Sequence, residues 1–152
     1  MTDENKLLLH VLNKLHVHTL RKHEILRKKQ QISLLFRDGK SVRGDFLKIV
    51  YVFLDPESNS APGCPVILFA VSKKTVPSSV HRNRVKRMMK EAYRLEKTSE
   101  EHKVFFSHEE STARLLCIAF LYTGRRKTIP GLEDFRPEVK RLLQHITPFL
   151  KE

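Results

Sequence analysis

The segment from Ser79 to Arg94, SVHRNRVKRMMKEAYR, restricts the fold more than any other part of the chain. Drawn as a helix at about 100° per residue, this segment has two distinct sides. One side is an apolar stripe that can pack on a core, formed by Val85, Met88, Met89, Ala92 and Leu95. The opposite side is a cationic arc of roughly 100°, made of Lys86, Lys90, Asn83, Arg94 and Arg87 and flanked by Arg82 and Arg84. We therefore expect a helix that is buried on its apolar side and exposed on its cationic side.

Carboxylates are too few to neutralise the cationic side, because the segment holds only Glu91 and Glu96 follows just after it. A solvated helix face is the alternative interpretation, but such faces usually mix signs at positions i and i+4. The net charge of +12 in 152 residues is also uneven. Residues 19–53 carry nine Lys and Arg against three Asp and Glu, and residues 73–97 carry nine against two. Two concentrated basic regions favour contact with the phosphate backbone of RNA or DNA.

Other classes of function fit the residues less well. A helix that binds a membrane surface presents large apolar residues to lipid, whereas this stripe is mainly Val, Met and Ala. No apolar run reaches the roughly 18 to 20 residues of a membrane span, and residues 1–18 lack the pattern of a secretory signal. Cys64 and Cys117 form no CxxC pair, and His16 with His18 lacks a third ligand nearby. We expect a cytoplasmic protein with no metal site and no membrane partner.

The remaining pattern predicts a single domain of mixed helices and strands. Apolar residues at helical spacing predict further helices at 4–17, 24–37 and 132–146. Runs of β-branched and aromatic residues predict strands at 45–55, 65–72 and 114–122. The turn residues at 56–65 most simply join the first two strands as a hairpin. Either Ser78 or Ser79 can cap the basic helix.

Three segments of the chain stand in a specific order and spacing. The first is a helix closed by a glycine turn, LRKKQQISLLFRDGKS at 26–41. The second is a strand ending FAVSKK at 69–74, and the third is RNRVKRMMKEAYR at 82–94. Together they resemble the bacterial ribonuclease P protein component over about residues 19–146. The spacing of Val-Ser-Lys-Lys from Arg-Asn-Arg-x-Lys-Arg is more specific than basic composition.

The resemblance implies an α+β fold. A small mixed four-stranded sheet would carry helices packed on one face, as an αβββαβα-like two-layer sandwich with an extra N-terminal helix. Residues 1–18 would form the N-terminal helical extension, and residues 19–152 a single RNA-binding domain.

The resemblance also implies a function, that of the protein subunit of ribonuclease P. Such a subunit binds the catalytic RNA and the 5′ leader of precursor tRNA, and it assists the endonucleolytic removal of the leader. Mg²⁺ would be held mainly by the partner RNA and the substrate, none would be bound by the protein alone, and no protein partner is expected. The chain would contribute no catalytic residue, and its acids agree with this, since Asp45 and Asp55 bracket one predicted strand too far apart to share a metal.

Carried over position by position, the resemblance predicts two groups of site residues. Contact with the catalytic RNA is assigned to Arg82, Asn83, Arg84, Lys86, Arg87, Lys90, Arg94, Lys73 and Lys74. The leader-binding cleft is assigned to Ile32 and Phe36, with Lys48 or Tyr51 as an addition that depends on strand register. Ile32 departs from the family, which usually has an aromatic residue there. The loop 75–81 departs as well, because it lacks the usual glycine and is one residue longer.

Alternatives remain open at this point. Phe36 has an interpretation as an ordinary core residue. A ribosomal-type basic RNA-binding protein without a processing role is a second possible function, and a protein-only metal nuclease is a third.

Overall fold

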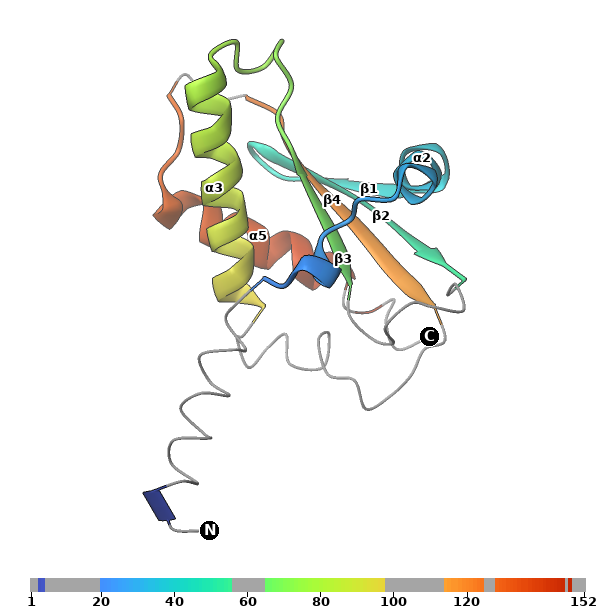
Figure 1. Cartoon of the computed structure of the whole chain (residues 1–152). Coiled ribbons are helices and arrows are strands. Elements are labelled where there is room, and N and C mark those ends of the chain that lie inside the picture. The colour runs from blue at the N-terminus through green and yellow to red at the C-terminus, as the bar shows by residue number, and fades with distance from the viewer. Residues whose placement is uncertain are drawn as a thin grey trace.

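The computed structural model describes residues 3–4, 20–55, 65–97, 114–124, 128–146 and 148. The predicted helix at 4–17 falls almost entirely outside these residues, so the N-terminal extension stays a prediction. The elements follow the order η1 (Lys22–Glu24), α2 (Lys29–Asp38), β1 (Lys40–Arg43), β2 (Leu47–Leu54), β3 (Val66–Ala70), α3 (Ser79–Glu96), β4 (Leu115–Tyr122) and α5 (Leu132–Ile146). Figure 1 shows a sheet with helices on both sides.

The four strands form one mixed sheet in the order β1-β2-β4-β3. β2 is antiparallel to both β1 and β4, whereas β3 and β4 are parallel and are connected through α3. The interior position suits β4, because its sequence LLCIAFLY is apolar at successive positions and both of its sides are buried. The predicted α+β class and mixed four-stranded sheet are therefore confirmed.

The predicted hairpin between 45–55 and 65–72 is wrong, because β4 lies between β2 and β3. β2 forms its hairpin with β1 instead, and the amide of Gly44 donates to the carbonyl of Leu47 (2.7 Å) in the turn. The sequence of β1, KSVR, contains a single apolar residue and lies at the edge of the sheet. A short, charged edge strand carries no pattern of alternating hydrophobicity, so the residue pattern at 40–43 did not predict a strand.

Different helices cover the two faces of the sheet. α3 and α5 pack on the face that includes Ile49 and Phe120. α2 lies on the other face, where Leu35 packs with Val50 and Ala119. The prediction that helices pack on one face is confirmed for α3 and α5 and is wrong for α2. Because successive residues of β2 and β4 are apolar, both faces of these strands need to be covered.

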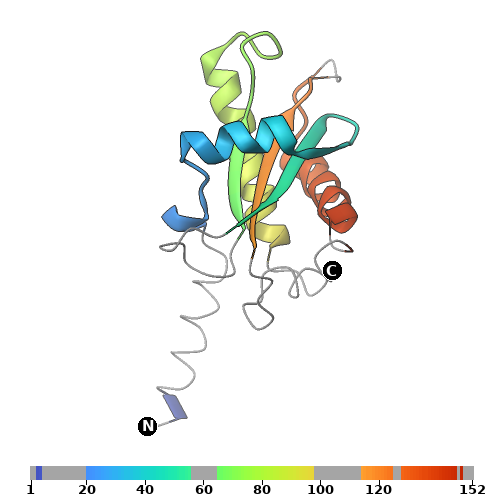
Figure 2. The same ribbon diagram turned by 90° about the vertical axis from the view of Figure 1, so that its right-hand side faces the viewer.

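The path of α2 is determined at both of its ends. Before the helix, the amide of Leu26 donates to the carbonyl of Ile67 (2.9 Å), and Ile25 forms a parallel bridge with Ile67 along the edge of β3. After the helix, Gly39 lies so close to β2 that a Cβ atom there would be 2.6 Å from Cγ1 of Val50. The helix therefore crosses the sheet from β3 to β2, as Figure 2 shows. Since Ile25 and Leu26 pair with Ile67 of β3, the helix begins at Lys29, later than predicted.

Candidate nucleic-acid interface

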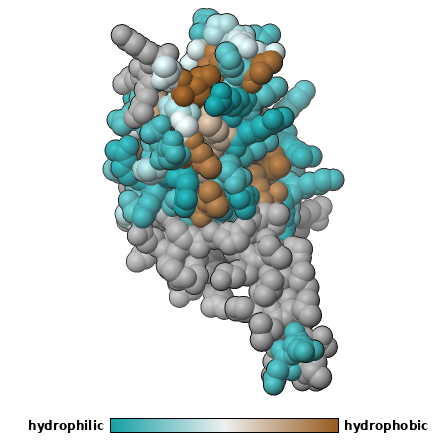
Figure 3. All heavy atoms as spheres, turned by 90° about the vertical axis from the view of Figure 1, so that its left-hand side faces the viewer, coloured by the Kyte–Doolittle hydropathy of each residue, from teal (hydrophilic) through white to brown (hydrophobic). Residues whose placement is uncertain are grey.

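The helix α3 buries its apolar stripe and exposes its cationic side, as its sequence predicts. Ser78 precedes the helix, and its hydroxyl accepts a hydrogen bond from the amide of His81 (3.5 Å). Val85, Met89 and Ala92 are fully buried in the core that the helix shares with the sheet and α5. Figure 3 shows this side of the molecule, where hydrophilic side chains cover most of the coloured surface and smaller hydrophobic patches lie between them.

The cations of α3 differ along the helix in how they are paired. Arg84, Lys86, Arg87 and Lys90 have no ionic partner among the residues that the structure describes. Three of these four side chains are exposed, and Lys86 is half-buried. Positive charge without a compensating carboxylate is thus concentrated in the first half of the helix.

The second half of α3 is largely neutralised by ion pairs. Arg94 pairs with Glu91, and this hydrogen-bonded guanidinium lowers the pKa of the Glu91 carboxyl. Lys97, just after the helix, contacts Glu24 of η1 (2.5 Å). Glu96 lies 3.5 Å from Arg136 of α5. The predicted contact residue Arg94 therefore belongs to the neutralised half, and residues 82–90 form the cationic surface of α3.

Arg82 differs from the other cations of this surface, because its side chain bonds to the protein itself. Its Nη1 donates to the carbonyl of Val76 (2.9 Å) and to the carbonyl of Pro77 (2.7 Å). The residue is half-buried. Sequence reading placed Arg82 among the residues that contact RNA and did not detect this link to the preceding loop.

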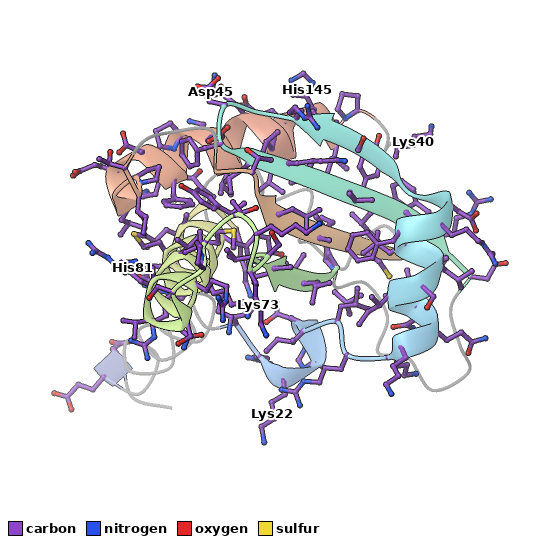
Figure 4. The ribbon with its side chains drawn as sticks, turned by 90° about the horizontal axis from the view of Figure 1, so that it is seen from above. Lys22, Lys40, Asp45, Lys73, His81 and His145 are labelled. Atoms are coloured by element: carbon purple, nitrogen blue, oxygen red, sulfur yellow. The ribbon has the colours of Figure 1, made fainter. Side chains whose placement is uncertain are left out.

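The predicted pair Lys73 and Lys74 is exposed in a turn directly after β3. The hydroxyls of Ser72 and Thr75 are 2.8 Å apart, and the amide of Thr75 donates to the Ser72 hydroxyl (3.1 Å). The amide of Val76 then donates to the carbonyl of Ser72 (3.0 Å), which closes the turn. Seen from above in Figure 4, Lys73 lies between α3 and α2.

The register of the sheet separates the two strand residues predicted for the leader cleft. Lys48 pairs with Leu121 of β4 and with Arg43 of β1, on the face that α2 covers. Tyr51 points to the opposite face, where it is buried with the core of α3 and α5. Because side chains alternate between faces along a strand, residues 48 and 51 cannot share one face. The prediction that Tyr51 lines a site with Ile32 and Phe36 is therefore wrong.

A row of four residues crosses the sheet on the α2 face, and the sequence pattern did not reveal it. The strand register places four residues side by side: Ala70 of β3, Leu121 of β4, Lys48 of β2 and Arg43 of β1. Arg43 is exposed, and the other three are half-buried. Because the residue pattern at 40–43 did not locate a strand there, Arg43 could not be placed beside Lys48. We call these four residues the basic-apolar row.

Ile32 and Phe36 lie one turn apart on α2. Ile32 is half-buried against the cluster between α2 and the sheet. Phe36 is 49% exposed, which contradicts the interpretation of this side chain as an ordinary core residue. An exposed aromatic ring on the same side of the sheet as the basic-apolar row is an arrangement that suits stacking on a nucleic-acid base.

The described acids do not form a cluster. Asp45 is exposed and lies 3.5 Å from Arg141, while Asp38 pairs with Arg37. Over the described ranges, no group of three or more His, Cys, Asp or Glu residues could hold a metal ion. Within the same ranges, no helix has the length and the apolar content needed to cross a membrane. Cys117 is buried, and burial raises the pKa of its thiol to about 11.

Comparison with known proteins agrees with this arrangement. A family model described as "Ribonuclease P" matches residues 20–115. The chain is 46% identical to the ribonuclease P protein component of Chlorobium phaeobacteroides, over 90% of this chain and 93% of that protein. It is 39% identical to the ribonuclease P protein component of Chlorobaculum tepidum, over 90% of this chain and 88% of that protein.

A solved structure shares the fold. The ribonuclease P protein of Staphylococcus aureus superimposes with a TM-score of 0.57 at 15% identity, covering 80% of this chain and 94% of that one. At this level of identity the likeness concerns the fold alone. The family match and the two relatives carry the assignment: the chain belongs to the ribonuclease P protein family, whose members are protein components of the ribonucleoprotein endoribonuclease ribonuclease P.

Proposed function

We propose that this ribonuclease P protein uses two separate surfaces to bring two RNAs together. The cationic surface at residues 82–90 of α3 binds the catalytic RNA through its four cations without a described ionic partner, Arg84, Lys86, Arg87 and Lys90. The α2 face of the sheet, with Phe36, Ile32 and the basic-apolar row, binds the 5′ leader of precursor tRNA. The observation that carries the proposal is the unpaired positive charge on the exposed side of α3, where four cations have no ionic partner among the described residues.

The support for the catalytic RNA surface is electrostatic. Fixed cations on a rigid helix neutralise phosphates and release the counterions condensed on them. The helix is held by buried Val85, Met89 and Ala92, so the backbone that carries its cations is fixed by the protein core. Such contacts position the two molecules and carry little sequence information. Recognition of the catalytic RNA would then depend on the shape that this helix and the Lys73–Lys74 turn present together.

The support for the leader surface is a combination of an aromatic side chain and cations. The exposed ring of Phe36 can stack on an unpaired base, and stacking tolerates many base sequences. Arg43 and Lys48 are directly opposite each other on neighbouring strands and can contact successive phosphates. Since Ile32 is aliphatic, base stacking depends on Phe36 alone in this helix turn. We expect the preference for particular leader sequences to be weak.

The two surfaces lie on opposite sides of the sheet, as Figure 1 shows for α3 and α2. This separation allows two polyanions to approach one small protein without sharing the same cations. The protein then acts by lowering the repulsion between catalytic RNA and substrate and by holding the leader in place. Under this proposal Mg²⁺ is held mainly by the partner RNA and the substrate, and it supplies the Lewis acid for phosphodiester hydrolysis.

Reconstitution tests the proposed function. Cleavage of precursor tRNA by a cognate catalytic RNA would be measured at low Mg²⁺, with and without this chain, and the RNA alone at high Mg²⁺ would show that the RNA is active. Stimulation that requires both RNA and protein is the expected result. No stimulation would favour an RNA-binding protein without a processing role, and cleavage by the chain alone would favour a protein nuclease.

A further inference from the structure

We infer that Arg82 is a positioning residue, which holds the Lys73–Lys74 turn against the first turn of α3, and that its own charge is not a contact with the catalytic RNA. This inference rests on the proposed RNA-binding function of α3. It changes the role of a residue that the sequence pattern places among the RNA contacts. Through these bonds Arg82 would also determine the direction in which Lys73 and Lys74 point.

The geometry of the Arg82 side chain supports this role. Its Nη1 carries two N–H groups, and the carbonyls of Val76 and Pro77 accept from this one nitrogen at 2.9 and 2.7 Å. Hydrogen bonds from a charged donor are stronger than those between neutral groups. The planar guanidinium presents its donors in fixed directions, so the two bonds define the position of the loop relative to the helix.

The loop that Arg82 holds is also anchored at its other side. Val76 is buried in the core, and the Ser72 and Thr75 side chains close the turn that carries the lysines. Gly124, at the end of β4, has a φ of 67°, and a Cβ atom there would be 2.3 Å from Cγ2 of Thr75. Glycine therefore allows the end of β4 to approach the turn closely. With Arg82 bonded to residues 76 and 77, the turn is connected to the sheet, the core and α3.

Arg84 provides the matched comparison. It is an arginine on the same helix turn as Arg82, it is exposed, and it has no ionic partner among the described residues. A cation that contacts phosphate should tolerate replacement by lysine, whose ammonium is also charged. A guanidinium whose Nη1 donates to two carbonyls in fixed directions should not, because the lysine ammonium lacks the planar geometry and its donors rotate on a flexible stem. The two arginines are therefore distinguished by how they respond to the same pair of substitutions.

A double-mutant cycle tests the inference. The dissociation constant for the cognate catalytic RNA would be measured for Arg82→Ala, for Lys73→Ala with Lys74→Ala, and for the triple variant. We expect Arg82→Ala to weaken binding by about fivefold or more in the wild-type background and by less than about twofold in the double-lysine background. Arg82→Lys should behave like Arg82→Ala. A loss from Arg82→Ala that is equal in both backgrounds, or full rescue by Arg82→Lys, would overturn the inference.

Arg84 variants separate this inference from the proposed function. Arg84→Ala should weaken binding equally in both backgrounds, and Arg84→Lys should restore it. If Arg84→Ala has no effect and the wild-type chain does not bind the RNA, the proposed function fails. If Arg84→Ala weakens binding equally in both backgrounds and Arg82→Ala does the same, only the positioning role of Arg82 fails.

Hydrogen exchange supplies a readout that needs no RNA and that stays informative if Arg82→Ala folds poorly. In Arg82→Lys, the amides of Thr75 and Val76, which are bonded to Ser72, should exchange faster than in the wild-type chain. Arg84→Lys should leave them unchanged. Equal protection of these amides in the wild-type chain and in Arg82→Lys would contradict the positioning role.

Discussion

Replacing Arg84 and Arg87 together with alanine is expected to weaken RNA binding and to make it less sensitive to salt. Both side chains are exposed on α3 and have no ionic partner in the described part of the chain, so their removal breaks no described ion pair. Alanine is also the best helix former, and α3 should not be weakened by it. Any change in affinity therefore reports contacts with the RNA.

The expected magnitude follows from the two charges removed. Each neutralised phosphate contributes roughly 0.7 to 0.9 to the slope of log K against log salt concentration. Two lost contacts should lower the steepness of this slope by about 1.4 to 1.8. Between about 50 and about 200 mM salt, the affinity of the wild-type chain should therefore fall roughly tenfold more than that of the variant.

Fluorescence anisotropy of the labelled catalytic RNA over a salt series measures both quantities. The matched control is Arg136→Ala with Arg141→Ala on α5, which removes the same number of charges. Arg141 lies 3.5 Å from Asp45 in an exposed ion pair that contributes little to stability. Arg136 lies 3.5 Å from Glu96, whose carboxylate is buried, so the free energy of unfolding of the control is measured as well. The control should keep the wild-type slope, and the free energy of unfolding of the Arg84 and Arg87 variant should change by less than about 0.5 kcal/mol.

Two results would refute the reasoning. An unchanged slope in the Arg84 and Arg87 variant would mean that the RNA does not contact the cationic surface of α3. An equal decrease in the variant and in the α5 control would mean that net charge alone governs binding, with no defined surface.

Three further predictions concern the leader surface and the stability of the fold. Phe36→Ala should raise the dissociation constant for precursor tRNA with a leader more than for mature tRNA, because stacking on one base contributes about 1–3 kcal/mol; equal losses in filter binding would contradict a leader contact. Burial raises the pKa of Glu138, so its carboxyl contributes stability at low pH that is lost as pH rises through the raised pKa. Glu138→Gln keeps an oxygen acceptor for the Phe46 amide, which lies 3.0 Å from the Glu138 carboxylate in the wild-type chain. The variant should therefore lose less stability than the wild-type chain as pH rises from about 4 to about 7. Denaturant unfolding that gives the same pH profile for both proteins would refute this. Gly124→Ala should lower the free energy of unfolding by about 1–2 kcal/mol or more, since φ is 67° and the new methyl group would collide with Thr75; an unchanged thermal midpoint would show that the loop yields without cost.

The basic helix was predicted closely because its signals are local. A serine cap, the buried stripe and the exposed cations all follow from spacing within one segment. The structure confirms the stripe and the cationic side, and it places the cap, which the sequence left open between Ser78 and Ser79, at Ser78. The strands at 45–55, 65–72 and 114–122 were also found, since β-branched and aromatic residues favour strands wherever they pair. The edge strand β1 was missed when the residues were considered alone, because KSVR has no such run.

The side of the sheet on which a residue lies was decided by long-range pairing. The choice between Lys48 and Tyr51 depends on register, and register depends on partners in β1 and β4 that are distant in the chain. The position of Arg43 beside Lys48 has the same origin. Neither could be read from the spacing of residues within β2.

The amino-acid sequence alone was sufficient to establish the family, the cationic side of α3 and the α+β class, because periodicity and motif spacing act within short segments. Only the folded chain showed that β4 separates β2 from β3, that α2 covers the second face, and that Arg82 bonds to the loop before its own helix. The physical reason is that strand order, the covering of a face and a bond to a backbone carbonyl all depend on how separate segments pack together. Two arginines that look equivalent in the motif, Arg82 and Arg84, thereby acquire different surroundings.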